Sequence, residues 1–102
     1  AWQQARELYA DSHLEADGSK HYQLHGTLFF ASTTPFLNQF DPAGDPRHVT
    51  VDCRHLSFVD YSAIAALKTL RERYAKAGKQ LRVLHLSERC KKLLKRAREH
   101  HD

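Results

Sequence analysis

The sequence predicts an α/β fold in which helices pack on a small mixed β-sheet, with the elements in the order ββαβαβα. Two observations favour this fold. An Asp17-Gly18 pair separates two extended segments, as expected for an N-terminal β-hairpin. Further along, the β-branched segments 48–53 and 80–86 each precede a helical pattern, which is typical of parallel βαβ units. With 102 residues the chain is long enough for one hydrophobic core, so we expect a single domain over residues 1–102.

The N-terminal hairpin is predicted within residues 5–26. In its second arm Tyr22, Leu24 and Gly26 alternate with polar residues, which is the period of a strand with one face in water. The first arm alternates less regularly, as expected at the edge of a sheet. Between the arms, the Asp17-Gly18 pair is suited to the positive backbone angles of a tight hairpin turn.

A short helix is predicted after the hairpin. Its apolar stripe consists of Phe36, Leu37 and Phe40. The hydroxyl residues that can cap its start are Ser32, Thr33 and Thr34. Pro35 is tolerated in a first helical turn, and the turn-forming segment "DPAGDP" at 41–46 ends the helix.

Two longer helices follow the β-branched segments. The first has one apolar face at the helical period, formed by Ala63, Leu67, Leu70, Tyr74 and Ala77. Gly78 ends this helix, next to lysines that suit the negative end of its dipole. The second helix begins at Ser87, and the side chains that it buries are Cys90, Leu93, Leu94 and Ala97. Right-handed crossovers place both helices on one face of the sheet.

The positive charge is concentrated in the last helix. Of a formal net charge of +4, residues 1–88 contribute zero, and the excess lies in the segment 89–102. The cations of this segment are Arg89, Lys91, Lys92, Lys95, Arg96 and Arg98. We expect no nucleic-acid binding, because aromatic residues are not interleaved and no DNA-binding motif is present. Two interpretations remain, a solvated helix face and a contact with anionic lipid headgroups.

The composition predicts no cofactor, no metal site and no enzymatic activity. The two cysteines, Cys53 and Cys90, have no metal-binding spacing, and we expect both to be reduced, one on a buried strand and one on a helix. His21 and His25 on one strand are about 13 Å apart, too far to share an ion. The sequence contains no nucleophile elbow, phosphate-binding loop or dinucleotide-binding glycine pattern.

The stretch "FVDYSAIAAL" at 58–67 is the candidate functional segment. Asp60 follows a strand-like Phe-Val pair, and Ser62 precedes an Ala/Ile/Leu run. The simplest interpretation is that both residues cap the following helix. Alternatively, a phosphate on Ser62 would meet free N–H groups and the positive end of the helix dipole, and would change what binds this loop.

Taken together, several segments resemble a STAS domain along nearly the whole chain: "GTLFFAS…PF", the valine-rich strand, "FVDYSAIAAL" and "AGKQLRVLHLSERCKKLLKRA". The resemblance implies a docking loop at Asp60, Tyr61, Ser62 and Ala63. In stand-alone anti-sigma-factor antagonists, the hydroxyl at the position of Ser62 is the phospho-acceptor of a partner kinase. Here Tyr61 replaces a hydroxyl residue and Ala63 replaces a glycine of the family pattern.

The segments "LFFAS" and "PFLNQF" are more similar to the C-terminal STAS domain of sulfate permease (SulP) family transporters. Because the sequence contains no methionine, we expect it to be the end of a longer membrane transporter. This resemblance implies a soluble regulatory domain at the cytoplasmic face of the bacterial inner membrane. Its implied partners are the membrane portion of the parent transporter, a soluble regulatory protein and anionic lipid headgroups. The alternative is a free-standing anti-sigma-factor antagonist, switched by phosphorylation of Ser62.

Overall fold

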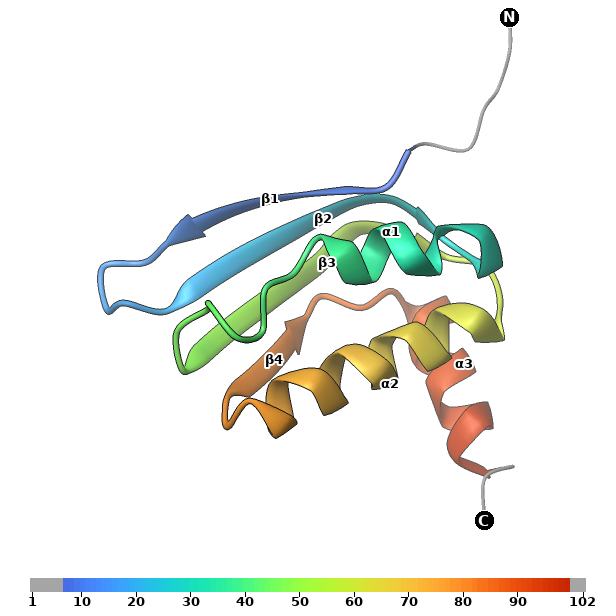
Figure 1. Cartoon of the computed structure of the whole chain (residues 1–102). Helices are drawn as coiled ribbons and strands as arrows, with labels where there is room; N and C mark the ends of the chain where they lie inside the picture. The colour runs from blue at the N-terminus through green and yellow to red at the C-terminus, as the bar shows by residue number, and fades with distance from the viewer. Residues whose placement is uncertain (1–6, 100–102) are drawn as a thin grey trace, which may run out of the picture.

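The computed structural model describes residues 7–99 and confirms the predicted order of elements (Figure 1). A short 3₁₀ turn, η1, precedes the first helix. The elements are β1 (Tyr9–Leu14), β2 (Lys20–Leu28), η1 (Phe30–Ser32), α1 (Thr33–Asn38), β3 (His48–Phe58), α2 (Tyr61–Lys76), β4 (Gln80–Leu84) and α3 (Glu88–Glu99). Within residues 7–99, no helix has both the length and the apolar character needed to cross a bilayer.

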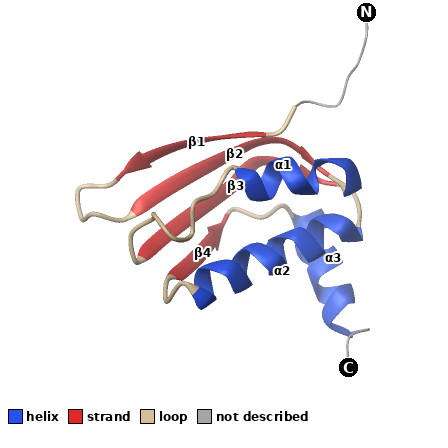
Figure 2. Ribbon diagram, in the orientation of Figure 1, coloured by secondary structure: helices blue, strands red, loops and turns tan. Residues whose placement is uncertain are grey.

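The four strands form one mixed sheet in the order β1-β2-β3-β4 (Figure 2). β1 pairs antiparallel with β2, as the predicted hairpin requires, whereas β2, β3 and β4 run parallel. Helices α1 and α2 cover one face of this sheet (Figure 1). Helix α3 contacts α2 and β3 and contributes Cys90 to the same core. The prediction that both longer helices lie on one face is therefore confirmed.

The turn between β1 and β2 is longer than predicted. Its backbone hydrogen bonds join Glu15 to Gly18 and Ser19, so the loop runs over five residues. Within this turn only Gly18 has a positive φ, of 88°. Asp17 stabilises the turn through its side chain instead of through a positive φ. The Asp17 carboxylate accepts hydrogen bonds from the backbone N–H and the hydroxyl of Ser19, at 2.9 and 2.6 Å. A side-chain turn of this kind does not require the aspartate to adopt positive angles.

The hydroxyl of Ser32 does not cap α1, contrary to the prediction. Ser32 precedes the helix, but its hydroxyl accepts a hydrogen bond from the backbone N–H of Phe29 at 3.0 Å and donates to the carbonyl of Thr27 at 2.8 Å. The 3₁₀ turn explains the difference, because it turns the Ser32 side chain back toward the end of β2. The Ser32 hydroxyl therefore links the loop between β2 and α1 to the end of β2.

Strand β3 extends five residues beyond its predicted end. The register with β2 shifts between Gln23 and His25, where Asp52 and His55 are their respective partners. The irregularity moves burial from the odd positions Val49, Val51 and Cys53 to the even positions Leu56 and Phe58. Strand β4, in contrast, ends at Leu84, two residues before its predicted end, and His85 leaves the sheet with a φ of 60°.

The core lies between the sheet and the helices. Four of the five residues predicted for the inner face of α2 are buried, namely Ala63, Leu67, Leu70 and Tyr74, whereas Ala77 is exposed just after the helix ends. Gly78 ends the helix with a φ of 75°, as predicted. Cys53 and Cys90 are free and buried, and burial raises the pKa of these thiols to about 12 and about 11. Both thiols are therefore protonated at neutral pH.

A buried carboxylate, Asp45, joins the sheet to α2. Only 6% of this residue is exposed. It accepts hydrogen bonds from the hydroxyls of Tyr22 and Tyr74, at 2.7 and 2.5 Å, and from the ammonium of Lys20 at 3.0 Å. Three donors from two elements thus converge on one residue of the loop between α1 and β3.

Candidate functional site

The candidate site lies where β3 passes into α2. The strand ends at Phe58, Val59 and Asp60 form the connection, and the helix begins at Tyr61. The backbone N–H of Val59 still donates to the carbonyl of Leu28 at 3.2 Å, so the end of β2 lies beside this corner. The predicted junction between a parallel strand and the longest helix is therefore present.

The Asp60 carboxylate binds two segments that are far apart in the sequence. Its Oδ1 accepts hydrogen bonds from the backbone N–H groups of Ser62 and Ala63, at 3.0 and 3.3 Å, which makes Asp60 the N-cap of α2. Its Oδ2 accepts from the backbone N–H of Phe30 at 3.1 Å. Both oxygens are engaged, so the main role of Asp60 is to fix the β2–α1 loop against the start of α2.

Replacing Asp60 with alanine should lower the free energy of unfolding by about 2 kcal/mol, because the helix loses its cap and the Phe30 N–H loses its acceptor. Urea unfolding measures the loss. Amide hydrogen exchange should accelerate locally at residues 30, 62 and 63. The matched control is Asp11→Ala on β1, whose side chain is 70% exposed and whose loss should change stability by less than about 0.5 kcal/mol. Equal effects of the two substitutions would contradict the role assigned to Asp60.

Three large apolar side chains surround Asp60 and are exposed. Phe30 is 71% exposed, Tyr61 53% and Val59 42%. They account for three of the five large apolar residues that are exposed within the described part of the chain. Val59 and Tyr61 flank Asp60 in the sequence, and the Phe30 backbone is bonded to its carboxylate. We call Phe30, Val59 and Tyr61 the corner patch.

Phe30 and Val59 were not among the predicted site residues. Both belong to apolar stretches, "LFFAS" and "FVDYS". From the sequence alone, such stretches indicate buried segments and not exposed ones. The one available signal was that "FF" cannot bury both rings on the same side of a strand, because successive side chains alternate. The neighbouring Phe29 is half-buried and contacts the Phe30 ring edge-on, with 5.4 Å between the ring centroids.

The other predicted docking residues differ in exposure. Ser62 is half-buried in the first turn of α2, whereas Ala63 is fully buried and packs in the core. The N–H groups of both residues already donate to Asp60. A phosphate on Ser62 would therefore compete with a carboxylate for these N–H groups instead of finding them free.

Four histidines lie on the sheet face opposite the helices. His21 and His25 alternate along β2 with core residues, and they stack on His13 of β1 and His55 of β3, with ring centroids 5.2 and 5.4 Å apart. His25 Nε2 lies 3.2 Å from Asp11 Oδ2, but not in hydrogen-bonding geometry. Within residues 7–99, no group of three or more His, Cys, Asp or Glu side chains is placed to hold a metal ion.

The cations of the basic helix all point to solvent. On α3 the exposed residues include Arg89, Lys91, Lys92, Lys95, Arg96 and Arg98. The apolar side of α3 faces the core through buried Cys90 and half-buried Leu93 and Leu94. The helix begins at Glu88, one residue after its predicted start. Ser87 caps it, because its hydroxyl accepts a hydrogen bond from the Cys90 N–H at 3.1 Å.

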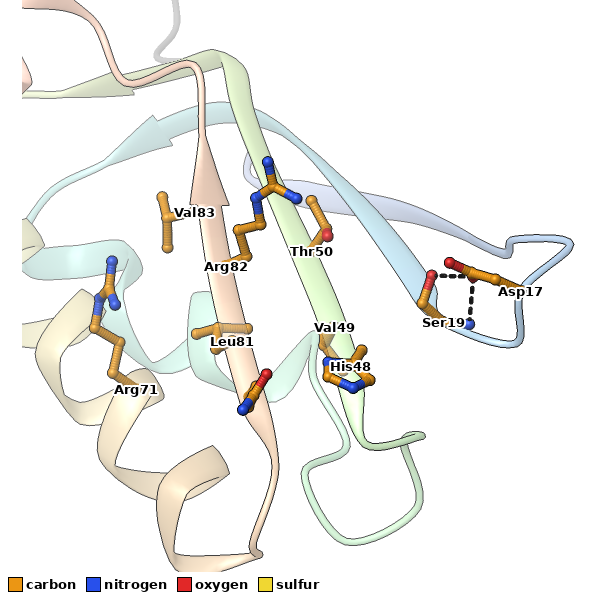
Figure 3. Close-up of a pocket in the computed structure, with 10 residues that line it drawn as sticks. Asp17, Ser19, His48, Val49, Thr50, Arg71, Leu81, Arg82 and Val83 are labelled. Carbon is orange, nitrogen blue, oxygen red and sulfur yellow. Dashed lines mark hydrogen bonds between the residues drawn. The ribbon is translucent and has the colours of Figure 1, made fainter.

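A wide depression of about 920 Å³ lies at the opposite end of the sheet, around the edge strand β4 (Figure 3). Leu81, Val83 and Arg71 lie on one side of this strand, and Arg82 and Thr50 lie on the other. The depression therefore wraps around a sheet edge and is not an enclosed cavity. It also lies near the start of β3 and β4, whereas open α/β sheets usually bind ligands at the carboxyl ends of their strands.

Comparisons with known proteins agree with this architecture. The family model described as STAS domain matches residues 13–101. YbaR of Bacillus subtilis (strain 168), which is named as a sulfate transporter, is 31% identical over 84 residues. These residues cover 82% of this chain but 18% of YbaR.

Two solved structures share the fold. The STAS domain of an anti-sigma-factor antagonist from Rhodobacter sphaeroides matches with a TM-score of 0.72 and 27% identity, over 79% of this chain and 92% of that one. The structure of SLC26A9 matches with a TM-score of 0.70 and 20% identity, over 89% of this chain and 20% of that one. The chain thus spans about a fifth of YbaR and of SLC26A9 and most of the antagonist. Because the family model covers most of its length, the chain belongs to the STAS domain family.

Proposed function

We propose that this STAS domain is a regulatory docking module of a sulfate permease-type anion transporter, at the cytoplasmic face of the bacterial inner membrane. STAS domains are regulatory and interaction domains, and the similarity to YbaR extends over 82% of the chain. In this proposal the membrane portion carries the anion. The STAS domain regulates folding or gating through its contacts with that portion or with a soluble regulatory protein.

The observation that carries the proposal is the corner patch. Exposed apolar side chains that gather at one place are typical of interaction sites, whereas scattered ones are normal on any surface. Two of the three patch residues are aromatic, and aromatic residues are enriched at the centres of protein interfaces. Asp60 holds the patch on a rigid support, so its binding costs little conformational entropy.

A site-specific cross-linking experiment tests the docking. A photoreactive phenylalanine analogue is placed at Phe30 or Tyr61 in the full-length gene product, in its native membrane. We expect each position to cross-link to the membrane portion of the chain or to a soluble protein. The matched controls are Tyr9 and Leu14, which are 50% and 68% exposed but lie on β1. Cross-linking at the patch no stronger than at these two positions would contradict docking at the corner.

The second candidate is a free-standing anti-sigma-factor antagonist. It is favoured by the 27% identity to the Rhodobacter sphaeroides antagonist, almost all of which this chain covers. This function requires phosphorylation of Ser62, and incubation with anti-sigma kinases and ATP followed by mass spectrometry tests it. Two departures from the family pattern count against this function, because Tyr61 replaces a hydroxyl residue and Ala63 replaces a glycine beside Ser62.

A further inference from the structure

A second surface, between α2 and α3, has the features of a binding groove. The two helices contact each other, and residues of both line a pocket of about 280 Å³. Its apolar lining consists of Ile64 and Leu67 from α2 and of Leu94 and Ala97 from α3. We call this pocket the α2–α3 groove. It shares helix α2 with the corner patch but has no residue in common with it.

The rim of the groove is cationic. Arg71 and Lys68 of α2 line it on one side and Arg98 of α3 on the other, and all three residues are exposed. No carboxylate is among the described residues that line the groove. The remaining cations of α3 add to the same positive field. An occupant that complements the groove therefore has an apolar centre and acidic groups on both sides.

The concave shape distinguishes a protein helix from a lipid surface. A helix that inserts into a bilayer presents protruding apolar side chains. On α3, however, Leu93 and Leu94 are half-buried and packed against the core, and the cations project beyond them. The apolar surface is thus recessed and suits a side chain that enters it. A cavity of about 150 Å³ already admits a benzene-sized group, so this one has room for a leucine or an aromatic ring.

We propose that the α2–α3 groove binds an acidic amphipathic helix of a protein partner. An apolar side chain of that helix fills the groove, as in other complexes in which a helix lies in an apolar groove. Flanking Asp or Glu residues pair with Arg71 and Arg98, whose guanidinium groups can form bidentate hydrogen bonds with carboxylates.

A synthetic peptide provides the probe for this proposal. It is an amphipathic helix of about 15 residues, with leucines on one face and glutamates on both flanks. Fluorescence anisotropy at physiological salt should show that it binds the 102-residue chain at least about tenfold more tightly than a scrambled peptide of the same composition. Equal binding of the two peptides would overturn the proposal, because net charge alone would then explain the affinity.

Three variants identify the groove as the site. The double charge reversal Arg71→Glu with Arg98→Glu should weaken peptide binding about tenfold or more. Its matched control, Lys92→Glu with Arg96→Glu, makes the same change in net charge on α3 outside the groove lining and should weaken binding much less. Ala97→Phe fills the groove without changing any charge and should also abolish binding. Thermal unfolding verifies that each variant is folded.

Anionic vesicles test the alternative occupant. Binding of the wild-type chain and of the same variants to vesicles of phosphatidylcholine with phosphatidylglycerol is measured. If Ala97→Phe leaves peptide binding intact, or if both double charge reversals weaken it equally, the groove is not the binding site and the proposal is wrong. Vesicle binding by the wild-type chain without any preference for the amphipathic peptide would likewise contradict the proposal and assign the basic helix to lipid headgroups.

Discussion

Replacing Asp45 with alanine is expected to lower the free energy of unfolding by about 3 to 5 kcal/mol. The substitution leaves the hydroxyls of Tyr22 and Tyr74 without their shared acceptor, and a buried polar group that loses its partner costs about 1 to 3 kcal/mol. Tyr74 is fully buried and Tyr22 is only 3% exposed, so water has little access to either hydroxyl. Lys20 also loses its ion pair.

A double-mutant cycle separates this network from simple loss of packing. In the wild-type chain, Tyr74→Phe should be destabilising. In the Asp45→Ala background it should cost much less, because it removes a hydroxyl that has already lost its carboxylate acceptor. Urea unfolding of the wild-type chain and the three variants gives the coupling energy. Additive costs in the two backgrounds would show that Asp45 and Tyr74 stabilise the fold independently.

The same carboxylate predicts how stability depends on acid. Burial by itself raises the pKa of Asp45, but the hydrogen bonds from Tyr22, Tyr74 and Lys20 outweigh burial and hold this pKa below its ordinary value. The stabilisation is therefore complete above the pKa of an unfolded aspartate, about 3.9, and is lost as the pH falls further through the folded-state pKa. Asp45→Asn should flatten this acid limb in urea unfolding at a series of pH values. An unchanged acid limb would contradict the assignment.

Local patterns predicted the elements of this chain well. The hairpin, the two β-branched strands and the face of α2 all follow from patterns within a few residues. The serine that caps α3 also follows from such a local pattern. The errors occur where contacts with a segment distant in the sequence determine the local structure. Strand β3 was predicted too short because an irregularity in its pairing with β2 shifts burial from odd to even positions. No sequence pattern within the strand indicates this irregularity.

The candidate site was predicted only in part, for the same physical reason. A carboxylate before a helix predicts a cap, and Asp60 is one. Its bond to the Phe30 N–H joins residues thirty positions apart, and no local pattern encodes it. Asp45 is a similar case. The segment "DPAGDP", which contains Asp45, indicates only a turn. The buried role of Asp45 is not visible in that segment, because its three partners come from positions 20, 22 and 74.

Gly26→Ala is the second substitution with a large expected effect, and we expect it to cost about 3 kcal/mol or more. Gly26 lies in β2 with a φ of 105°, a conformation that alanine adopts only with strain. A Cβ at this position would lie 2.7 Å from the carbonyl oxygen of Glu7 and 2.8 Å from Cα of Leu8. Both are backbone atoms, so the segment that leads into β1 must move away.

The chain offers a matched control that isolates the close approach from the backbone angle. Gly18 also has a positive φ, of 88°, but a Cβ there would meet nothing within 4 Å. Gly18→Ala should therefore cost only the conformational strain, about 1 to 2 kcal/mol. Urea unfolding compares the two variants, and amide exchange should accelerate along β1 in Gly26→Ala alone. Equal costs would mean that the β1 segment yields freely, and that Gly26 is required only for its backbone angle.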